Sequence, residues 1–432
     1  MDKNDVFKFK EEGDSAFQQG DFSKAVASYD ACIALRPQFW GAHHFKAQAL
    51  SQLNKPLEAA AAYWQAYLFS NFDKKMAIMA ARALSDAKLY VEACDTFELF
   101  SIDVLDNETL VYYLWSLRQQ GRAREAYRLI PRLGLNKSIY ANIVIAYILI
   151  DLNLTTEAFE LLPIFEAAPY NDYIADILFC FYSMRKESNK AKSALDTMIT
   201  NSVDPAYSAC LRIALDIIEE KNQTPINAYR SLQYFRLIDS ANYLAKHKAI
   251  YYTATTFETF DFLAPQVMTQ GLVLEFGVRF GCTISRLSEL FPDREIYGFD
   301  SFQGLPEAWA GEEKGSYTTL NRLPEVSDNV TLVKGWFNDT LPAFKKEHPD
   351  PIAFMNMDAD LYSSTKDVLD SLKDQIIKGT IIVFDEYIIN QTWREDEYKA
   401  FQEWVVENKV VYQYVAASMT TKQVAVIITQ KG

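Results

Sequence analysis

The fold of the second half of this chain is decided by Leu272-Val273-Leu274-Glu275-Phe276-Gly277-Val278-Arg279-Phe280-Gly281, which Ile296-Tyr297-Gly298-Phe299-Asp300 completes. The apolar run at residues 272–276 predicts a strand that is buried on both faces. Gly277 and Gly281 follow it, and a glycine lets the backbone turn sharply and approach a ligand because it has no Cβ. Residues 282–291 carry apolar side chains at helical spacing, which predicts a helix before the second strand.

Each of these two strands ends in a carboxylate. Asp300 follows the glycine turn by about 20 residues, the spacing at which an acid binds ribose hydroxyls in nucleotide-binding folds. Glu275 lies at the end of an otherwise apolar strand. Because burying an unpaired carboxylate is unfavourable, we expect Glu275 to face a cationic or hydroxyl-bearing ligand. The Gly-x-x-x-Gly spacing alone is weak evidence, since an ordinary strand, turn and helix also produces it.

Strands and helices continue to alternate after Asp300. Further strands are expected at 330–334, 352–358, 380–384, 410–415 and 424–429, and helices at 341–347, 364–377 and 396–407. The alternation predicts a Rossmann-like α/β domain at residues 271–432 with a mostly parallel, seven-stranded sheet. Ligands of such sheets bind beyond the carboxyl ends of the strands. The sequence places five acids there: Glu275, Asp300, Asp358, Asp385 and Glu386.

Four motifs in this half resemble the macrocin-type O-methyltransferases: LEFGVRFG at 274–281, FDSFQGLPE at 299–307, MDADLYSST at 357–365 and FDEY at 384–387. The resemblance covers residues from about 250 to 430. It implies a class I enzyme that uses S-adenosylmethionine and Mg²⁺ to methylate sugar hydroxyls of natural products. The donor site that it implies consists of Glu275, Phe276, Gly277, Gly281, Asp300, Ser301, Phe302, Gly335 and Trp336.

Three carboxylates from two neighbouring strand ends suit a hard cation such as Mg²⁺, which prefers oxygen ligands. Asp358, Asp385 and Glu386 are therefore the predicted metal ligands. A bound metal would lower the pKa of the hydroxyl that attacks the methyl group. For Asp358 and Asp385 the alternative is a helix N-cap, a position that Asp favours.

The predicted general base is Asp358, with metal activation alone as the alternative. His348 is the only histidine of the catalytic half, and we expect it to lie away from the site. Asp360 is expected to be a loop or capping residue rather than a fourth ligand. Trp309 and Trp393 are lid residues or packing residues, and the sequence does not separate these roles.

The first half of the chain repeats a pattern of paired helices. Residues 5–37 contain Gly13, Ala16, Gly20, Ala25, Tyr29 and Pro37, and they resemble a tetratricopeptide repeat. Six alanines recur at intervals of 34, 34, 33, 32 and 33 residues: Ala25, Ala59, Ala93, Ala126, Ala158 and Ala191. We therefore expect an α-helical TPR solenoid at residues 1–222, although a bundle with accidental spacing is the alternative. Such a solenoid binds a partner or self-associates through its concave face. Residues 223–270 are expected to form a helical connector, with helices at 228–247 and 257–268.

Composition limits the function. The net charge of −14 argues against nucleic acid as a ligand, since phosphate contacts need a basic surface. No apolar run reaches 18 residues, so no membrane span is expected. The charged start of the chain lacks the apolar region of a signal peptide. Five scattered cysteines without metal-binding spacing favour reduced thiols and a cytoplasmic location.

Three functions compete. The first is an S-adenosylmethionine-dependent, Mg²⁺-dependent O-methyltransferase that acts on a hydroxyl of a small-molecule sugar, a glycosylated natural product or a glycan, with repeats for oligomerisation or partner binding. The second is a TPR scaffold with a catalytically idle methyltransferase-like domain. The third is a nicotinamide-dependent oxidoreductase, which the missing middle glycine and the acid cluster argue against.

Overall fold

The computed structural model describes residues 3–134, 137–220 and 234–431. Packing divides the chain into two compact units, Met1–Ile148 and Leu149–Gly432. No helix within the described residues combines the length and the apolar character that a membrane crossing requires.

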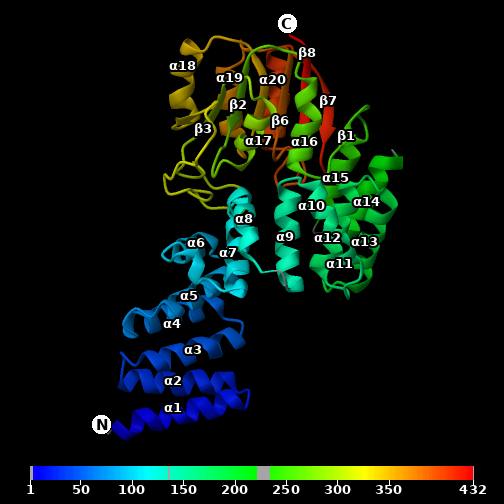
Figure 1. Cartoon of the computed structure of the whole chain (residues 1–432). Coiled ribbons are helices and arrows are strands. Elements are labelled where there is room, and N and C mark those ends of the chain that lie inside the picture. Colours follow the sequence, from blue (N-terminus) through cyan, green and yellow to red (C-terminus); the bar gives the residue numbers. More distant parts are fainter. Residues whose placement is uncertain (1–2, 135–136, 221–233, 432) are drawn as a thin grey trace. The chain divides into compact units, whose positions relative to one another are not determined.

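The first unit is a stack of paired helices (Figure 1). Its elements are α1 (Lys3–Gln18), α2 (Phe22–Leu35), α3 (Trp40–Gln52), α4 (Pro56–Phe69), α5 (Lys74–Asp86), α6 (Tyr90–Phe97), η1 (Ile102–Val104), α7 (Asn107–Gln119), α8 (Ala123–Leu129), η2 (Ile130–Arg132) and most of α9 (Ile139–Asp151). A Cβ on Gly13 would lie 2.6 Å from the ring of Tyr29, so glycine lets α1 and α2 approach closely. The four recurring alanines of this unit are completely buried on the second helix of each pair. The predicted repeat packing is confirmed.

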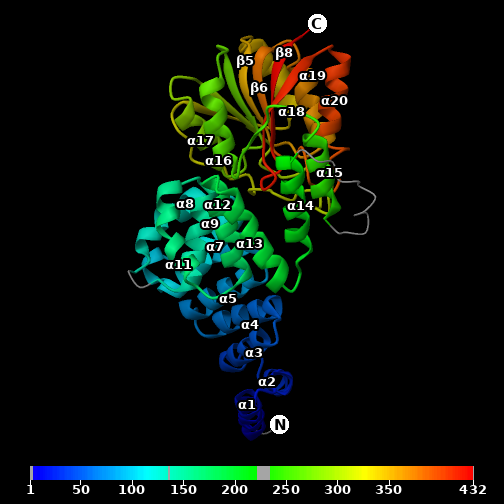
Figure 2. The same ribbon diagram turned by 90° about the vertical axis from the view of Figure 1, so that its right-hand side faces the viewer.

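The second unit begins with further helices, which Figure 2 shows below the sheet. They are α10 (Thr155–Glu160), α11 (Leu162–Glu166), α12 (Asp172–Met184), α13 (Ser188–Asn201), α14 (Ala206–Glu220) and α15 (Phe235–Leu244). Ala158 and Ala191 are again buried. The expected helix at 228–247 begins outside the described residues, and its described part is α15. Helices α10 to α14 pack in the same unit as the sheet. Division by packing does not test the repeat boundary at residue 222 or the connector boundary at 270, so both stay predictions.

One sheet of eight strands forms the centre of the second unit, in the order β1-β7-β8-β6-β5-β2-β3-β4. The strands are β1 (Tyr251–Tyr252), β2 (Leu272–Phe276), β3 (Ile296–Asp300), β4 (Val330–Lys334), β5 (Ile352–Met357), β6 (Ile376–Phe384), β7 (Val411–Ala417) and β8 (Val424–Gln430). Only β8 runs antiparallel to its neighbours, β6 and β7. The predicted α/β class with a mostly parallel sheet is confirmed, with β1 as an eighth strand that the sequence did not predict.

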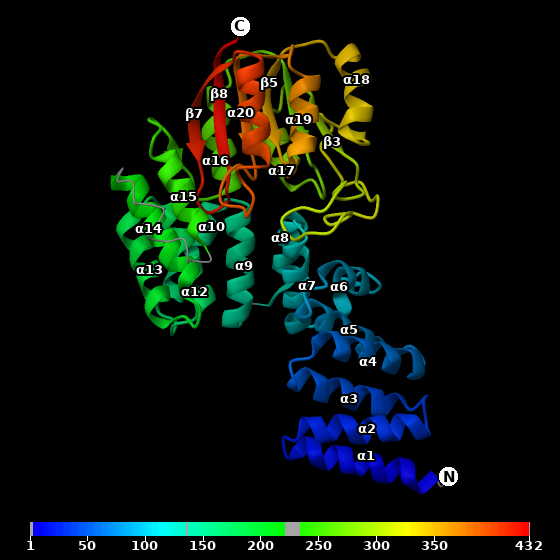
Figure 3. The same ribbon diagram turned by 180° about the vertical axis from the view of Figure 1, so that it is seen from behind.

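Helices cover both faces of this sheet (Figure 3). Helices α16 (Thr256–Leu263) and α17 (Cys282–Leu290) lie on one face, and α18 (Phe337–Glu347), α19 (Tyr362–Ser371) and α20 (Glu397–Glu407) lie on the other. The short η4 (Ala264–Gln266) follows α16. Residues 301–329 between β3 and β4 form no helix. This long loop instead contributes to the wall of a cavity at the carboxyl ends of the strands.

Candidate functional site

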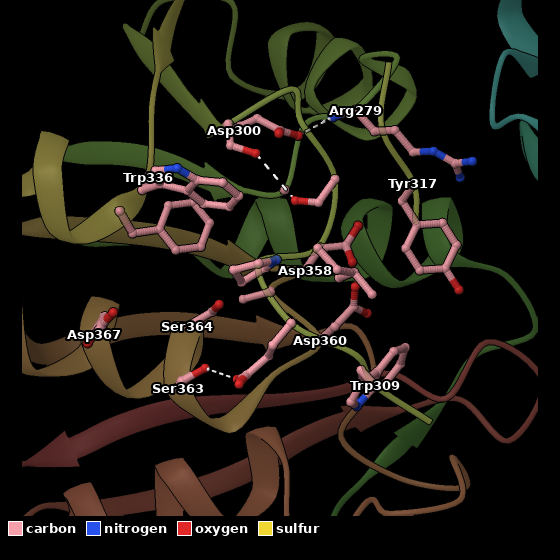
Figure 4. Close-up of a pocket in the computed structure, with 18 of the residues that line it drawn as sticks. Arg279, Asp300, Trp309, Tyr317, Trp336, Asp358, Asp360, Ser363, Ser364 and Asp367 are labelled. Atoms are coloured by element: carbon pink, nitrogen blue, oxygen red, sulfur yellow. Dashed lines mark hydrogen bonds between the residues drawn. The ribbon is translucent and has the colours of Figure 1, made fainter. Parts of the chain in front are cut away.

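A cavity of about 710 Å³ lies at the carboxyl ends of β2 to β6 (Figure 4). The turn after β2 contributes Gly277 and Arg279, and the ends of β5 and β6 contribute acidic side chains. The end of β3 and the loop after it supply Asp300, Ser301, Gly304, Leu305, Pro306, Glu307, Trp309, Lys314 and Tyr317, and the turn after β4 and the start of α18 supply residues 335–339. The cavity therefore lies where a mostly parallel sheet binds its ligands.

Asp300 holds the turn after β2 in place. Its Oδ2 accepts hydrogen bonds from the backbone N–H groups of Val278 at 2.9 Å and Arg279 at 2.7 Å. Its Oδ1 accepts from the N–H of Phe302 at 2.6 Å. Gly277 in the same turn has φ +94°, and a Cβ there would lie 1.9 Å from the carbonyl oxygen of Asp358. The carboxylate of Asp300 thus holds both the turn after β2 and the start of the loop after β3, and Asp300 itself lines the cavity.

Five of the nine predicted donor residues line the cavity: Gly277, Asp300, Ser301, Gly335 and Trp336. The other four are not among its lining residues: Glu275, Phe276, Gly281 and Phe302. Trp336 faces the cavity from the turn before α18 (Figure 4). The role of each residue toward a donor stays a prediction.

The side chain of Glu275 is completely buried in this structure, and its expected role toward a ligand stays a prediction. Glu275 pairs with Asn356 across β2 and β5, within the sheet. Its Oε1 accepts from Thr283 Oγ1 at 2.7 Å, while its buried Oε2 has no hydrogen-bond partner. Burial raises the pKa of Glu275 to about 8. A carboxyl group that stays protonated avoids the unfavourable burial of a charge.

The predicted metal ligands Asp358, Asp385 and Glu386 all line the cavity. Burial, followed by the charge of Asp385, raises the pKa of Asp358 well above its usual value. Burial also raises the pKa of Asp385, although Gln423 Nε2 donates to its Oδ1 at 2.6 Å. Three neighbouring carboxylates in a buried site therefore hold protons more tightly than carboxylates in water.

Glu386 combines a paired and an unpaired oxygen. Its Oε1 lies 2.8 Å from Lys422 Nζ, whereas its buried Oε2 has no hydrogen-bond partner. Burial raises the pKa of Glu386 to about 7. In the part of the chain that the structure describes, no three His, Cys, Asp or Glu side chains are already gathered as a metal site. The residue types suit a hard cation, and the side chains would have to converge around it.

The N-cap alternative for the strand-end acids is excluded, because the N-caps of α19 and α20 are Leu361 and Asp396. Asp360, expected in a loop, lines the cavity with φ +58°. Burial raises its pKa to about 7. Asp360 is therefore a loop residue, as expected, that also lines the cavity.

The structure separates the two tryptophans whose roles the sequence left open. Trp309 lines the cavity. Trp393 is 3 % exposed and packs against Tyr243 and Tyr398. His348 hydrogen-bonds with Tyr297 through Nδ1 at 3.2 Å and does not line the cavity, as expected.

Glu397 supports the cavity from behind its wall, and the sequence did not predict this role. It is completely buried in the first turn of α20. Its Oε1 accepts from the N–H of Ala359 at 3.4 Å, and its Oε2 accepts from the N–H of Glu386 at 3.1 Å. Glu397 therefore joins the loops that follow β5 and β6. An acid at a helix start is common, so its position alone gave no signal.

Helix α15 also forms hydrogen bonds with the loop after β6. Arg394 donates two hydrogen bonds to Asp239, at 3.0 and 2.9 Å. Ser240 Oγ accepts from the N–H of Ile389 at 3.0 Å. These contacts span about 150 residues of sequence, from 149 to 155, so no local pattern predicts them.

Comparisons with known proteins concern this half of the chain most directly. Residues 263–411 match the family model "Macrocin-O-methyltransferase (TylF)". This match confirms the resemblance that the four motifs indicate.

Two curated relatives are O-methyltransferases by name. The demethyldecarbamoylnovobiocin O-methyltransferase of Streptomyces niveus is 32 % identical over 129 residues, which are 25 % of this chain and 48 % of that protein. The 8-demethyl-8-(2,3-dimethoxy-alpha-L-rhamnosyl)-tetracenomycin-C 4'-O-methyltransferase of Streptomyces olivaceus is 29 % identical over 116 residues, 22 % of this chain and 43 % of that protein. The chain spans about half the length of the curated relatives it matches.

Among solved structures, a tetratricopeptide repeat protein from Parabacteroides merdae ATCC 43184 is 15 % identical. The match has a TM-score of 0.44 and covers 56 % of this chain and 100 % of that chain.

Proposed function

We propose that this protein is an S-adenosylmethionine-dependent O-methyltransferase of the cytoplasm that methylates a hydroxyl of a sugar, a glycosylated natural product or a glycan. The observation that carries the proposal is the family match at residues 263–411, because its four motifs supply the glycine turn and the acids of one cavity. The two relatives are named for O-methylation of demethyldecarbamoylnovobiocin and of a rhamnosyl tetracenomycin derivative.

In this proposal the donor occupies the cavity from Trp336 to the turn after β2. Asp300 binds the ribose hydroxyls, Gly277 leaves room for the methionine part, and the indole of Trp336 stacks near the adenine. The methyl carbon moves from sulfur to the acceptor oxygen, so a C–S bond breaks as a C–O bond forms. The chain contributes mainly by holding these atoms in line and by keeping water out of the cavity.

Asp358 takes the proton of the acceptor hydroxyl. Its raised pKa supports this role, because a carboxylate with a higher pKa is a stronger base. Asp358, Asp385 and Glu386 would hold Mg²⁺, which the unpaired Oε2 of Glu386 and the mutual repulsion of the carboxylates favour. A bound Mg²⁺ would lower the pKa of the acceptor hydroxyl.

The metal has a direct test that uses both binding and turnover. EDTA should abolish methyl transfer, and added Mg²⁺ should restore it. Asp385→Asn should bind S-adenosylhomocysteine as the unaltered protein does, measured by calorimetry, yet lose turnover, because it changes the acceptor side alone. Full activity in EDTA would remove the metal from the proposal and leave Asp358 as a simple base.

The donor itself is tested by thermal unfolding. S-adenosylmethionine and S-adenosylhomocysteine should raise the melting temperature by mass action, whereas NAD should not. An idle scaffold is the alternative, in which the repeats bind a partner and the cavity is unused. In that case neither adenosyl compound would stabilise the protein, although the repeats would still associate.

A further inference from the structure

Arg279 is a cation in the wall of the cavity, where the charges of Asp358, Asp360 and Asp300 act on it without a direct ion pair. Its side chain is partly buried, and its Nε is fully buried without a hydrogen-bond partner. The guanidinium rests over the rings of Phe280 and Tyr317, at 5.8 and 5.1 Å from their centres. Among the described residues it forms no ion pair, although arginines near the cavity such as Arg394 do. A guanidinium held this way has carboxylates in the same cavity but no direct ion pair with one of them, although direct pairing normally offsets a buried charge.

The backbone of Arg279 is also unusual. Its φ of +50° is left-handed, between Gly277 at +94° and Gly281 at +77°. A side chain with a Cβ costs about 1 kcal/mol or more in that conformation, and such residues cluster at functional sites. Arg279 therefore occupies a left-handed backbone position that would be less strained with glycine.

The wall of the cavity carries charges of both signs. Its acids at the strand ends, Asp358, Asp360, Asp385 and Glu386, contrast with Arg279 on the turn after β2 and Lys314 on the long loop. Figure 4 shows Arg279 leaving the turn on the side of Asp300 opposite to Trp336 and reaching toward Tyr317. If the adenosine of the donor lies at Trp336, the guanidinium of Arg279 lies at the opposite end of the cavity, which is then the end left for the acceptor.

We propose that Arg279, assisted by Lys314, binds an anionic group of the methyl acceptor, a phosphate or a carboxylate attached to the sugar that is methylated. The inference rests on the proposed function and narrows its substrate to acidic sugars, among which sugar phosphates and nucleotide sugars fit. A guanidinium presents paired N–H donors that match a phosphate or a carboxylate. With a net charge of −14, the protein as a whole does not attract anions, so an anionic acceptor needs a local cation such as Arg279.

The donor also carries an anionic group, its α-carboxylate, and the experiment separates the two sources. Inorganic phosphate and pyrophosphate are titrated in EDTA, at constant ionic strength, against protein saturated with S-adenosylhomocysteine and against protein saturated with 5′-methylthioadenosine, which lacks the carboxylate. Binding to both complexes supports an acceptor anion. Binding only to the 5′-methylthioadenosine complex means that the donor's carboxylate occupies Arg279, and it overturns the inference.

Variants complete the test. Arg279→Gln should weaken pyrophosphate binding about tenfold or more, the loss expected for a charge-assisted hydrogen bond, with unchanged affinity for S-adenosylhomocysteine. Arg279→Lys should bind pyrophosphate with intermediate affinity, because lysine keeps the positive charge but lacks the paired N–H donors of a guanidinium. Arg286→Gln is the matched control, since Arg286 pairs with Asp261 away from the cavity. Equal pyrophosphate affinity in Arg279→Gln, or no binding to the unaltered protein, overturns the inference. Failure of S-adenosylhomocysteine itself to bind would instead count against the proposed function.

Discussion

Glu275 makes the stability of the second unit depend on pH. In the folded protein burial raises its pKa from 4.5 to about 8. Below pH 4.5 the carboxyl group is protonated in both states, so its burial is then least unfavourable. Between pH 4.5 and 8 the unfolded chain releases the proton and the folded protein keeps it. The free energy of unfolding therefore falls through this window as the pH rises.

Glu275→Gln should remove that dependence, because the amide keeps an acceptor for Thr283 and never ionises. The variant should gain stability over the unaltered protein as the pH rises from 5 to 8, on the order of a few kcal/mol at the upper end. Urea unfolding at pH 5, 6.5 and 8 measures the difference, with the exposed Glu347→Gln as control. A difference that does not change with pH would mean that Glu275 is ionised in the folded protein.

Asp300→Ala tests the residue on which the predicted donor site depends most. The change removes the acceptor of three backbone N–H groups and the predicted partner of the ribose. We expect the affinity for S-adenosylhomocysteine to fall about tenfold or more, the effect of a lost charge-assisted hydrogen bond. Calorimetry measures the loss, and Asp367→Ala, which alters the cavity wall on α19, is the matched control. Unchanged affinity would refute the assignment of Asp300.

At the scale of elements, α15 supports the loop that carries Asp385 and Glu386. Asp239 and Arg394 form a forked pair in which the side chain of Asp239 is 9 % exposed. Loss of either partner should loosen the loop and lower turnover, while donor binding is kept. A double-mutant cycle tests this pair with the variants Asp239→Ala, Arg394→Ala and the combination of both. We expect a coupling free energy of about 1–3 kcal/mol between the two side chains. Strict additivity in thermal unfolding would show that the pair does not hold the loop.

Most elements of the α/β domain follow from local patterns. Apolar runs predicted β2 to β5, β7 and β8 within a few residues. The run is continuous in β2 and β5, whose residues are all buried, as strands buried on both faces require. The expected helix at 364–377 was too long. Leu372 and Ile376 fit helical spacing, yet α19 ends at Ser371 and β6 begins at Ile376, with Gly379 at φ +95° inside the strand. Local sequence cannot distinguish the two, since only pairing with β5 makes this segment a strand.

Some residues of the candidate site were also predictable from local sequence, and others were not. The strand-end acids were predictable because parallel strands bring their carboxyl ends to one edge. Arg279 and Glu397 were not, because their roles depend on partners far away in the sequence. Glu397 accepts a hydrogen bond from Ala359 across 38 residues, and the guanidinium of Arg279 lies over the ring of Tyr317 on the long loop. Periodicity and motif spacing carry no information on such contacts.

At the scale of the whole molecule, the helices that precede the sheet belong to its compact unit. Asn153, in the turn before α10, donates to Asp261 at 3.1 Å and accepts from Thr255 at 3.3 Å. Lys186, in the turn before α13, donates to the carbonyl oxygen of Tyr252 at 3.1 Å and pairs with Glu258. Both turns thus bind the β1–α16 region, which carries no cavity residue. We therefore expect the contacts of Asn153 and Lys186 to stabilise the second unit without taking part in catalysis.

Two shortened chains should therefore behave differently. A chain that begins at residue 137 keeps α9 whole and every contact of Asn153 and Lys186, so it should bind S-adenosylhomocysteine and melt like the complete protein. Its state of association, measured by light scattering, should change if the removed repeats mediate assembly. A chain that begins at residue 223 should still bind the donor, but it should melt at least about 4 °C lower, since about 1 kcal/mol shifts the melting temperature of a domain this size by 2–4 °C.

The full-length variant Asn153→Ala, Lys186→Gln should reproduce part of that decrease without shortening the chain, because it removes the same contacts. An exposed pair such as Lys399→Gln with Glu395→Gln should leave the melting temperature unchanged, since surface ion pairs contribute little. If the chain from residue 137 folds but binds no S-adenosylhomocysteine, the repeats of the first unit take part in the donor site. If the chain from residue 223 melts like the complete protein, helices α10 to α14 do not stabilise the sheet.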